Sequence, residues 1–342
     1  MATIYDIAKE TGYSPSTVAR ALSGKGYCGA KAKARILQVA EELQYVPSQA
    51  AKTLKSNITK KVMLCVPDIE NPYYFAMIHG VTKVLEEFGY SILLGYTMHD
   101  PQKELKVLDS LRGRFVDGLI LGSFNYTPQL AQAIENTGLP TVITSFYQSP
   151  TGFQGYDCVY VDQPQAAWVA TRHCLDKGHR SIAFVGGDPK EQNTRERFSG
   201  YRRALEEFGL EASQSLVIQG DFTREGAYEA FSRFLEQGGH CTAVVACNDL
   251  MGVGCMKACV DRGYQVPDKI SIVALDNTEY CLCTTPAMTS VDMLQEKIGE
   301  EAAGFVMDRI VNKRTYQKSV SFSPVLVERD SVRERKENTD CP

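Results

Sequence analysis

The chain has 342 residues, of which 44% are hydrophobic and 23% charged, a composition that excludes wholesale disorder and fibrous repeats. At about 100–200 residues per domain, the length predicts two or three domains. The formal net charge of −4 argues, taken alone, against a nucleic-acid-binding protein. No apolar run approaches the roughly 20 residues of a membrane helix and no export signal is recognisable, so we expect a cytoplasmic protein.

Charge is unevenly distributed along the chain. Residues 1–61 carry ten Lys/Arg and four Asp/Glu, a net charge of +6. The remaining residues carry 27 basic and 37 acidic side chains, a net charge of −10. A small basic segment joined to a large acidic one is expected when only the basic segment meets a polyanion. A merely solvated charged face is the alternative.

Three short helices are predicted in the basic segment. Ile4 and Ile7 lie at helical spacing, and Gly12 ends the first helix. Ser14 is expected to cap a second helix over residues 15–22. A third, over residues 31–43, closes a three-helix core, so the first two helices form a helix-turn-helix.

The second of these helices carries polar residues beside the predicted core. Ser14, Ser16, Thr17 and Arg20 are all expected to be exposed there. Short polar and cationic side chains on such a helix can contact base edges and phosphates, which favours DNA recognition. The alternative is a helical hairpin without a role in DNA binding.

The rest of the chain alternates strand and helix patterns. Helical patterns such as residues 74–88 and 166–177 separate apolar runs, and the series breaks near Val161. The apolar runs are residues 62–66, 92–95, 119–121, 141–143, 158–161, 182–185, 216–218, 243–246 and 270–275. Repeated β-α units predict parallel sheets covered on both faces, here in two doubly wound subdomains. Ligands bind beyond the carboxyl ends of such strands, so a cleft between the subdomains is expected.

Polar and aromatic residues follow the ends of the predicted strands. The candidate effector-binding residues are Asp68, Tyr73, Tyr74, Ser123, Phe146, Asp162, Thr194, Arg197, Phe222, Asn248 and Asp276. Carboxylates can accept hydrogen bonds from ligand hydroxyl or N–H groups, Arg197 can donate two, and Tyr73 and Phe222 offer flat faces to a ring. Two alternatives stay open, namely that Asn248 caps a helix and that Tyr74 belongs to the core.

Eleven cysteines, an odd number, lie partly inside apolar runs, which predicts reduced thiols. Cys255 and Cys259 are four residues apart, and Cys281 and Cys283 two apart, but no second pair or histidine cluster completes a zinc pattern. We expect small packing residues, no metal and no cofactor. No phosphate-binding glycine loop or nucleophile–base pattern suggests an enzyme.

The sequence resembles the LacI/GalR family of bacterial transcription regulators. The opening TIYDIAKETGYSPSTVARALSGKG carries the likeness first. It continues in order through YVPSQAAKTLKS, PDIENPYY, VDGLILGS, LDKGHRSIAFVGG, GDFTREGAY, ACNDLMGVG, VPDKISIVALDN and TPAMTSV. NPYY, GDFTREGAY and MDRIVNKR resemble the purine-repressor branch. The resemblance implies a small all-α helix-turn-helix head and an α/β body of two doubly wound parallel-sheet subdomains, similar to periplasmic binding proteins.

The resemblance also implies how the head meets DNA. The second helix would enter the major groove, with Pro15 and Ser16 at the base-reading positions and Arg20 reaching a guanine edge or a phosphate. A hinge helix would order on the operator and wedge Leu54 into the minor groove, unless Leu54 packs on the body instead. The implied DNA-binding residues are Thr3, Tyr5, Ser14, Pro15, Ser16, Thr17, Arg20, Lys31, Ala51, Leu54 and Lys55.

The implied domain order follows from the same resemblance. It comprises a helix-turn-helix domain (1–46), a hinge helix (47–60), an N-terminal effector-binding subdomain (61–161 and 291–321), a C-terminal one (162–290 and 322–330) and a flexible tail (331–342). We therefore predict a homodimeric repressor that binds near-palindromic double-stranded operator DNA and no membrane, controlled by a small molecule in the cleft.

The class of the effector is less constrained. A sugar or sugar derivative is predicted, with a nucleobase or nucleoside, or a phosphoprotein corepressor, as alternatives. Gln192 replaces an arginine of the purine branch, and Ser145 with Phe146 replaces an Asp-Arg pair common among sugar responders. A solute-binding transport protein is a remote alternative, against which the basic head argues.

Overall fold

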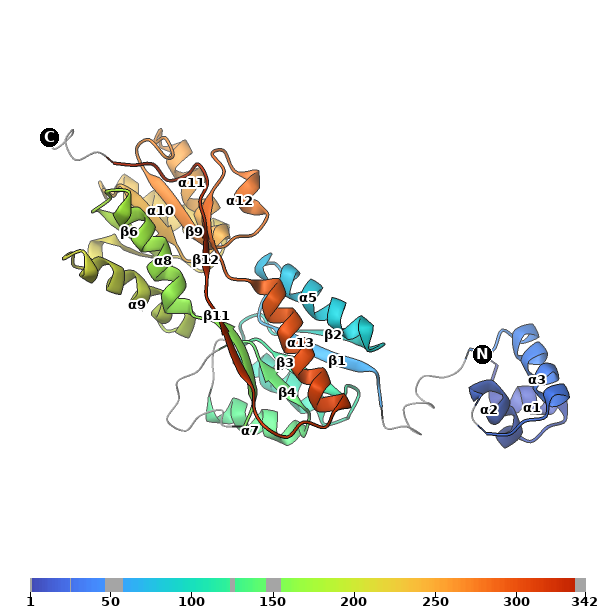
Figure 1. The fold of residues 1–342 in the computed structure, drawn as a ribbon. Helices are drawn as coiled ribbons and strands as arrows, with labels where there is room; N and C mark the ends of the chain where they lie inside the picture. The colour runs from blue at the N-terminus through green and yellow to red at the C-terminus, as the bar shows by residue number, and fades with distance from the viewer. Residues whose placement is uncertain (1, 25, 47–57, 124–126, 146–154, 336–342) are drawn as a thin grey trace. The chain divides into compact units, whose positions relative to one another are not determined.

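The computed structural model describes residues 2–24, 26–46, 58–123, 127–145 and 155–335 (Figure 1). The chain divides into two compact units, Met1–Thr59 and Lys60–Pro342, which are called the head and the body below. The predicted hinge residues 47–57 lie outside the described residues. No helix that the structure describes is long and apolar enough to cross a membrane.

The head is the expected three-helix unit. Its helices are α1 (Ile4–Thr11), α2 (Pro15–Ser23) and α3 (Ala30–Glu42). Thr3 and Asp6 form a capping box at the start of α1, and Gly12 ends that helix in the left-handed region, with a φ of 72°. Ile7, Val18 and Ile36, one from each helix, are fully buried at the centre. The predicted helix-turn-helix is confirmed.

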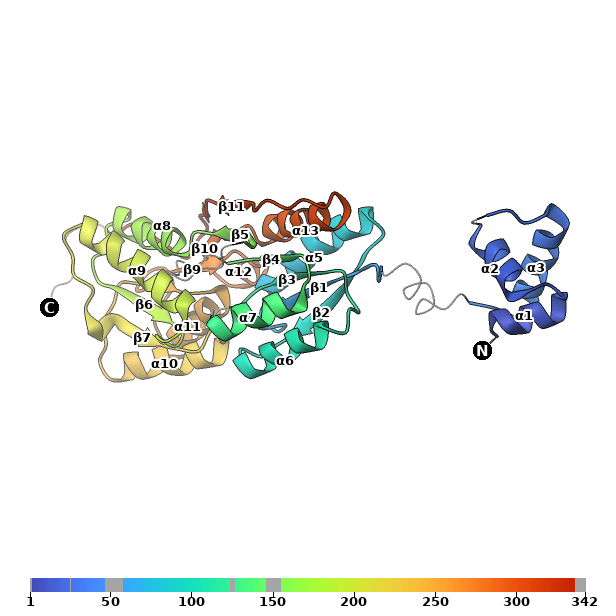
Figure 2. The same ribbon diagram turned by 90° about the horizontal axis from the view of Figure 1, so that it is seen from below.

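The first subdomain of the body contains a six-stranded parallel sheet in the order β11-β5-β4-β3-β1-β2. The strands are β1 (Lys61–Val66), β2 (Ser91–Tyr96), β3 (Gly118–Leu121), β4 (Thr141–Ile143), β5 (Asp157–Val161) and β11 (Ser319–Phe322). Its helices are α5 (Tyr73–Glu87), α6 (Pro101–Leu111), α7 (Pro128–Thr137) and α13 (Gln295–Val311). Along β1, Val62 and Leu64 belong to the core under α5 and α13, whereas Met63 and Cys65 belong to the core under α6 and α7, so both faces are covered (Figure 2).

The second subdomain repeats this architecture. Its sheet has the order β12-β10-β9-β8-β6-β7, and only the β10–β12 pair is antiparallel. The strands are β6 (Ile182–Gly186), β7 (Val217–Gln219), β8 (Ala243–Ala246), β9 (Ser271–Asp276), β10 (Thr289–Asp292) and β12 (Val325–Val327). The helices are α8 (Gln163–Asp176), α9 (Gln192–Glu207), α10 (Arg224–Glu236), α11 (Asp249–Asp261) and the short α12 (Tyr280–Cys283), with a 3-10 turn η1 (Gln214–Leu216) before β7. The predicted fold class is confirmed.

The chain passes between the two sheets three times: after β5, after β10 and between β11 and β12 (Figure 1). The division expected at residue 290 falls inside β10, whose four residues all belong to the second sheet. The error arises because a strand's apolar pattern does not reveal which sheet it joins.

Two glycines bring α5 and α13 into close contact within the first subdomain. A Cβ on Gly80 would lie 2.2 Å from the Glu296 carbonyl oxygen, and one on Gly299 would lie 2.3 Å from that of Met77. Only glycine permits backbones to approach this closely. Helices that are far apart in sequence are therefore held together along one tight seam.

The predicted flexible tail begins later than expected. Ser331 is fully buried, and its hydroxyl donates to the Ile272 carbonyl at 2.5 Å. The Arg335 amide donates to the Lys177 carbonyl at 2.8 Å. The expectation was wrong for residues 331–335, because their polar groups are satisfied by partners remote in sequence; residues 336–342 lie outside the described ones.

The ten cysteines that the structure describes are unpaired. Cys255 and Cys259 are fully buried in α11, and burial raises the pKa of the Cys259 thiol to about 12. Cys281 is buried and Cys283 is exposed. The buried thiols act as small packing residues. Within the described ranges, no group of three His, Cys, Asp or Glu side chains is placed to hold a metal ion.

Candidate effector cleft and DNA-reading helix

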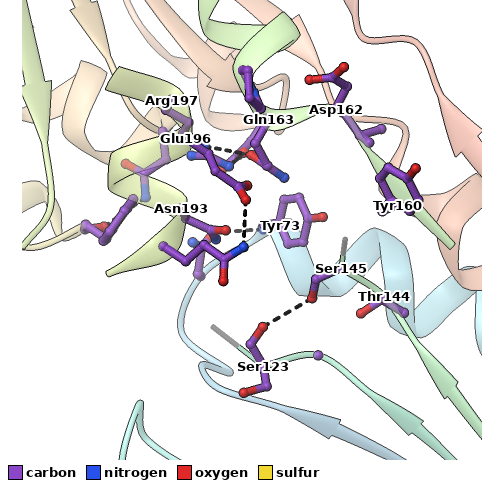
Figure 3. A pocket seen from close by; sticks show the side chains of 18 of the residues that line it. Tyr73, Ser123, Thr144, Ser145, Tyr160, Asp162, Gln163, Asn193, Glu196 and Arg197 are labelled. Atoms are coloured by element: carbon purple, nitrogen blue, oxygen red, sulfur yellow. Dashed lines mark hydrogen bonds and ion pairs between the residues drawn. The ribbon is translucent and has the colours of Figure 1, made fainter. Parts of the chain in front are cut away.

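A cavity of about 680 Å³ lies between the two subdomains, beyond the carboxyl ends of their strands (Figure 3). Nine predicted effector-binding residues line it, namely Asp68, Tyr73, Tyr74, Ser123, Asp162, Arg197, Phe222, Asn248 and Asp276. Phe146 lies outside the described residues. Thr194 does not line the cavity: it is buried in α9 with its methyl group toward Gly186 of β6. The prediction for Thr194 was wrong because that side chain faces its own sheet.

The first subdomain supplies a wall of hydroxyl groups. Ser123, Thr144 and Ser145 follow β3 and β4, and Tyr160 lies on β5 (Figure 3). The Ser145 hydroxyl donates to the Ser123 carbonyl at 3.1 Å. This wall can offer several hydroxyls to a ligand within one small region.

Three further predicted residues stand at the edge of this wall. The Tyr73 and Tyr74 rings meet edge to face, with centroids 5.0 Å apart. Tyr74 is only 4% exposed and belongs to the core as well as to the lining. Asp68 holds its own loop, because its carboxylate accepts the Glu70 amide at 2.7 Å.

A buried acid lies behind the same wall. Glu104, in the first turn of α6, is 5% exposed and shares a very small cavity with Ser123 and His99. Burial raises the pKa of Glu104 to about 7, and a hydrogen bond with Ser123 opposes this rise. The sequence gives no sign of this group, because acids in the first turn of a helix are ordinarily exposed.

Arg197 dominates the wall from the second subdomain, although it is only 5% exposed. Its Nε donates to Oε1 of Gln163 at 2.8 Å (Figure 3). Its Nη1 donates to the Cys247 carbonyl. Its Nη2 lies 3.7 Å from Oδ1 of Asp276. These partners fix the guanidinium before any ligand arrives.

Asp276 is the most unusual group of the cleft. It is 2% exposed, its backbone φ is 111°, and its Oδ1 has no hydrogen-bond partner among the described residues. Burial raises the pKa of Asp276 well above its usual range, against the opposing charge of Arg197. This carboxyl oxygen is buried, lines a cavity and lacks a hydrogen bond, so it can bind a polar group of a ligand.

Asp162 and Asn248 both cap helices. The Asp162 carboxylate accepts the Gln165 amide at 2.9 Å at the start of α8, and remains exposed to the cavity. Oδ1 of Asn248 accepts the Met251 amide at 2.8 Å at the start of α11, and the residue is 1% exposed. The helix-cap alternative for Asn248 therefore describes its observed hydrogen bond.

Sequence reasoning missed one face of α9. Asn193, Glu196 and Arg197 lie three and four residues apart and all line the cavity (Figure 3). Oε1 of Glu196 accepts from Gln192 at 2.7 Å, and burial raises the pKa of Glu196. Helical spacing from Arg197 could have found Asn193, and the same spacing from Asn193 could have found Glu196.

In the head, the predicted DNA-binding residues that the structure describes are exposed or partly exposed. Thr3, Tyr5, Ser14, Pro15, Ser16, Arg20 and Lys31 are exposed, and Thr17 is partly exposed. The Ser14 hydroxyl caps α2 and lies 2.9 Å from the hydroxyls of Ser16 and Thr17. Nε of Arg20 donates to the Ser16 carbonyl at 3.3 Å. Ala51, Leu54 and Lys55 lie outside the described residues.

Comparisons with known proteins agree with both units. Residues 3–48 match the bacterial regulatory proteins of the lacI family, and residues 171–332 match the periplasmic binding protein-like domain. The chain is 32% identical over 334 residues to the HTH-type transcriptional repressor PurR of Klebsiella pneumoniae (strain 342), covering 97% of each.

Solved structures show the same similarity. The transcriptional regulator CelR–cellobiose complex matches with a TM-score of 0.73 and 27% identity, over 97% of this chain and 100% of that one. The lac repressor dimer bound to operator and the anti-inducer ONPF shares the fold, with a TM-score of 0.83 at 20% identity over 97% and 99% of the two chains. The chain belongs to the lacI family of bacterial regulatory proteins, a family of DNA-binding, non-enzymatic repressors with an effector-binding domain.

Proposed function

We propose that this protein represses transcription by binding a near-palindromic operator as a homodimer, and that a sugar or sugar derivative in the cleft controls its operator affinity. The observation that carries the proposal is the cleft itself. It is large enough for a small molecule, and hydrogen-bonding side chains line it from both subdomains. A ligand that bridges two subdomains can bias their relative placement, which is the differential binding that a switch needs.

The chemistry of the lining favours a polyhydroxylated ligand. Ser123, Thr144 and Tyr160 offer hydroxyls on one side, while Asp162 and Asn193 offer a carboxylate and an amide on the other. Sugar hydroxyls both donate and accept, so they suit a lining of mixed donors and acceptors. The similarity to the CelR–cellobiose complex supports the same class.

A purine nucleobase or nucleoside is the second candidate, favoured by the full-length similarity to PurR. Phe222 offers a flat face, and a protonated Asp276 could donate to a ring nitrogen. Against it, Gln192 is uncharged and already donates to Glu196.

Exposed apolar side chains support the proposed homodimer. Phe75 on α5, Leu94 on β2 and Met98 are 51%, 42% and 53% exposed in the first subdomain. Val260 on α11 and Leu282 on α12 are 64% and 69% exposed in the second. Such residues are expected where a second copy covers them. We expect sedimentation equilibrium to give a dimer, and Leu282→Asp to weaken it; a monomeric wild-type chain would contradict the proposal.

The DNA-binding part of the proposal is tested with operators selected from random duplexes by the full-length protein. Affinity measured by fluorescence anisotropy should fall steeply as salt rises, because cationic contacts release counterions from phosphates. Arg20→Ala should abolish the preference for the selected sequence, and Leu54→Ala should weaken specific binding and reduce DNA bending. A flat salt response would overturn this part.

The effector is sought by thermal shift with mono- and disaccharides, nucleobases and nucleosides, because a molecule that binds only the folded chain raises the melting temperature. A hit should change operator affinity in the anisotropy assay. Arg197→Lys should reduce the shift, whereas Arg202→Ala, exposed on the same helix and not part of the cavity lining, serves as the matched control. A shift from nucleobases alone would replace the sugar with the second candidate.

A further inference from the structure

Phe222 adopts a backbone conformation that aromatic residues rarely take. It lies between β7 and α10 with a φ of 65°, in the left-handed region. A bulky side chain is uncommon there, so the surrounding structure must hold the residue in place. Phe222 is also one of the aromatic side chains that line the cleft.

The Phe222 ring lies directly against Gly187, the residue after β6. A Cβ on Gly187 would lie 2.1 Å from Cε2 of the ring and 2.5 Å from Cδ2. Any larger residue at position 187 would push the ring away from the strand ends. The absence of a side chain at Gly187 therefore leaves the space that the Phe222 ring occupies.

Asn248 connects Phe222 to the end of a third strand. It follows β8, and its Nδ2 donates to the Phe222 carbonyl at 2.9 Å while its Oδ1 caps α11. Asn248 is 1% exposed, and its amide group bonds both to Phe222 and to the start of α11. Residues that follow three different strands thus meet at Phe222, with Gly187 against its ring and Asn248 at its carbonyl.

We infer that Asn248 is a positioning residue that holds Phe222 in its left-handed conformation, so that the ring, seated on Gly187, forms a fixed flat part of the cleft wall. This role, through the Phe222 carbonyl, is additional to the place of Asn248 in the cavity lining. A fixed ring face is suited to the apolar face of a pyranose or to a nucleobase. The inference depends on the proposed function only in treating this cavity as the effector site.

The test uses the full-length protein with 4-fluorophenylalanine at position 222, followed by ¹⁹F NMR without any ligand. Asn248→Asp and Asn248→Ser both keep a side chain that caps helices well, but both lose the N–H that the Phe222 carbonyl accepts. We expect each to move the fluorine resonance toward that of the denatured chain. Gly187→Ala should displace it too, although both hydrogen bonds of Asn248 remain.

The matched control is Thr127→Ala, which removes a side-chain cap from α7 on the first subdomain. It should lower the melting temperature and leave the fluorine resonance in place. The inference is overturned if Asn248→Asp and Asn248→Ser also lower the melting temperature without moving the resonance, since Asn248 would then be a helix cap alone. The readout is independent of any effector, so a failure of the proposed function would be visible separately, in the ligand screen.

Discussion

The two subdomains share a β-α architecture but line the opposite walls of the cleft with different kinds of side chain. The first presents hydroxyls such as Ser123, Thr144 and Tyr160. The second presents Arg197, Asn248 and Asp276, nearly all of whose surface is buried. The second wall is therefore ordered during folding, and a ligand that binds there does not have to order it. The first wall consists of hydroxyl groups, which can both donate hydrogen bonds to a ligand and accept them from it.

The largest effect should follow from removing the charge at the centre of the second wall. Arg197→Ala leaves Gln163 and the Cys247 carbonyl without their donor and opens space beside Asp276. We expect the free energy of unfolding, measured in urea, to fall by about 3–5 kcal/mol. Arg195→Ala, two residues away and exposed, should change it by less than about 0.5 kcal/mol. Equal effects would show that the second wall is not pre-organised by Arg197.

A buried acid contributes to the pH response of the first subdomain. Because burial raises the pKa of Glu104 from 4.5 to about 7, the folded chain binds more protons than the unfolded chain between these values. Stability contributed by the protonated form is therefore lost as pH rises from about 4.5 to 7, by up to about 3 kcal/mol. Glu104→Gln should remove this loss in urea titrations at pH 5 and pH 7.5. An unchanged slope would show that Glu104 does not titrate in this range.

A buried histidine gives the second subdomain the opposite response. His179 is 2% exposed, and burial lowers its pKa from 6.5 to about 4, although its bond to the Arg333 carbonyl at 3.1 Å opposes this. The unfolded chain binds the extra proton, so stability is lost as pH falls from about 6.5 to 4, again by up to about 3 kcal/mol. Relative to the wild-type chain, His179→Gln should therefore reduce the loss of stability towards acid pH, whereas Glu104→Gln should reduce the loss as pH rises to 7. The same change of slope, relative to the wild-type chain, in both variants would contradict these assignments.

The smallest effect should come from the hydroxyl wall. Ser145→Ala removes a hydrogen bond to the Ser123 carbonyl at a partly buried site. We expect the free energy of unfolding to fall by no more than about 1 kcal/mol. If the effector identified by thermal shift uses this wall, its affinity should fall more than the stability does. A loss of stability as large as that of Arg197→Ala would remove the contrast between the walls.

The sequence predicted the parts of the structure that depend on local pattern. The helices of the head, the strands of the body and most cleft residues were predictable, because strand ends in a parallel sheet converge on one edge. Thr194 and Asn193 show the limit of this rule. They are adjacent, yet one faces the sheet and the other the cavity, and only the docking of α9 decides between them.

Long-range partners account for the remaining differences. Ser331 appeared to belong to a polar tail, but its hydrogen bonds reach β9 and β10. Asn248 was predicted to line the cleft, and it does, but its amide also donates to the Phe222 carbonyl, 26 residues earlier in the chain. The bonds of Ser331 to the two strands and of Asn248 to Phe222 could not be identified from residues nearby in sequence.

The seam between α5 and α13 constrains the order in which the protein can be completed on the ribosome. Gly80 is made early, but Gly299 emerges only after the strands β6 to β10 of the other subdomain. At about 5–20 residues per second, roughly 10–50 s pass between the synthesis of Gly80 on α5 and that of Gly299 on α13. The subdomain that begins first in the chain is therefore the one whose fold stays open longer during synthesis, with an apolar helix face exposed until α13 has been made.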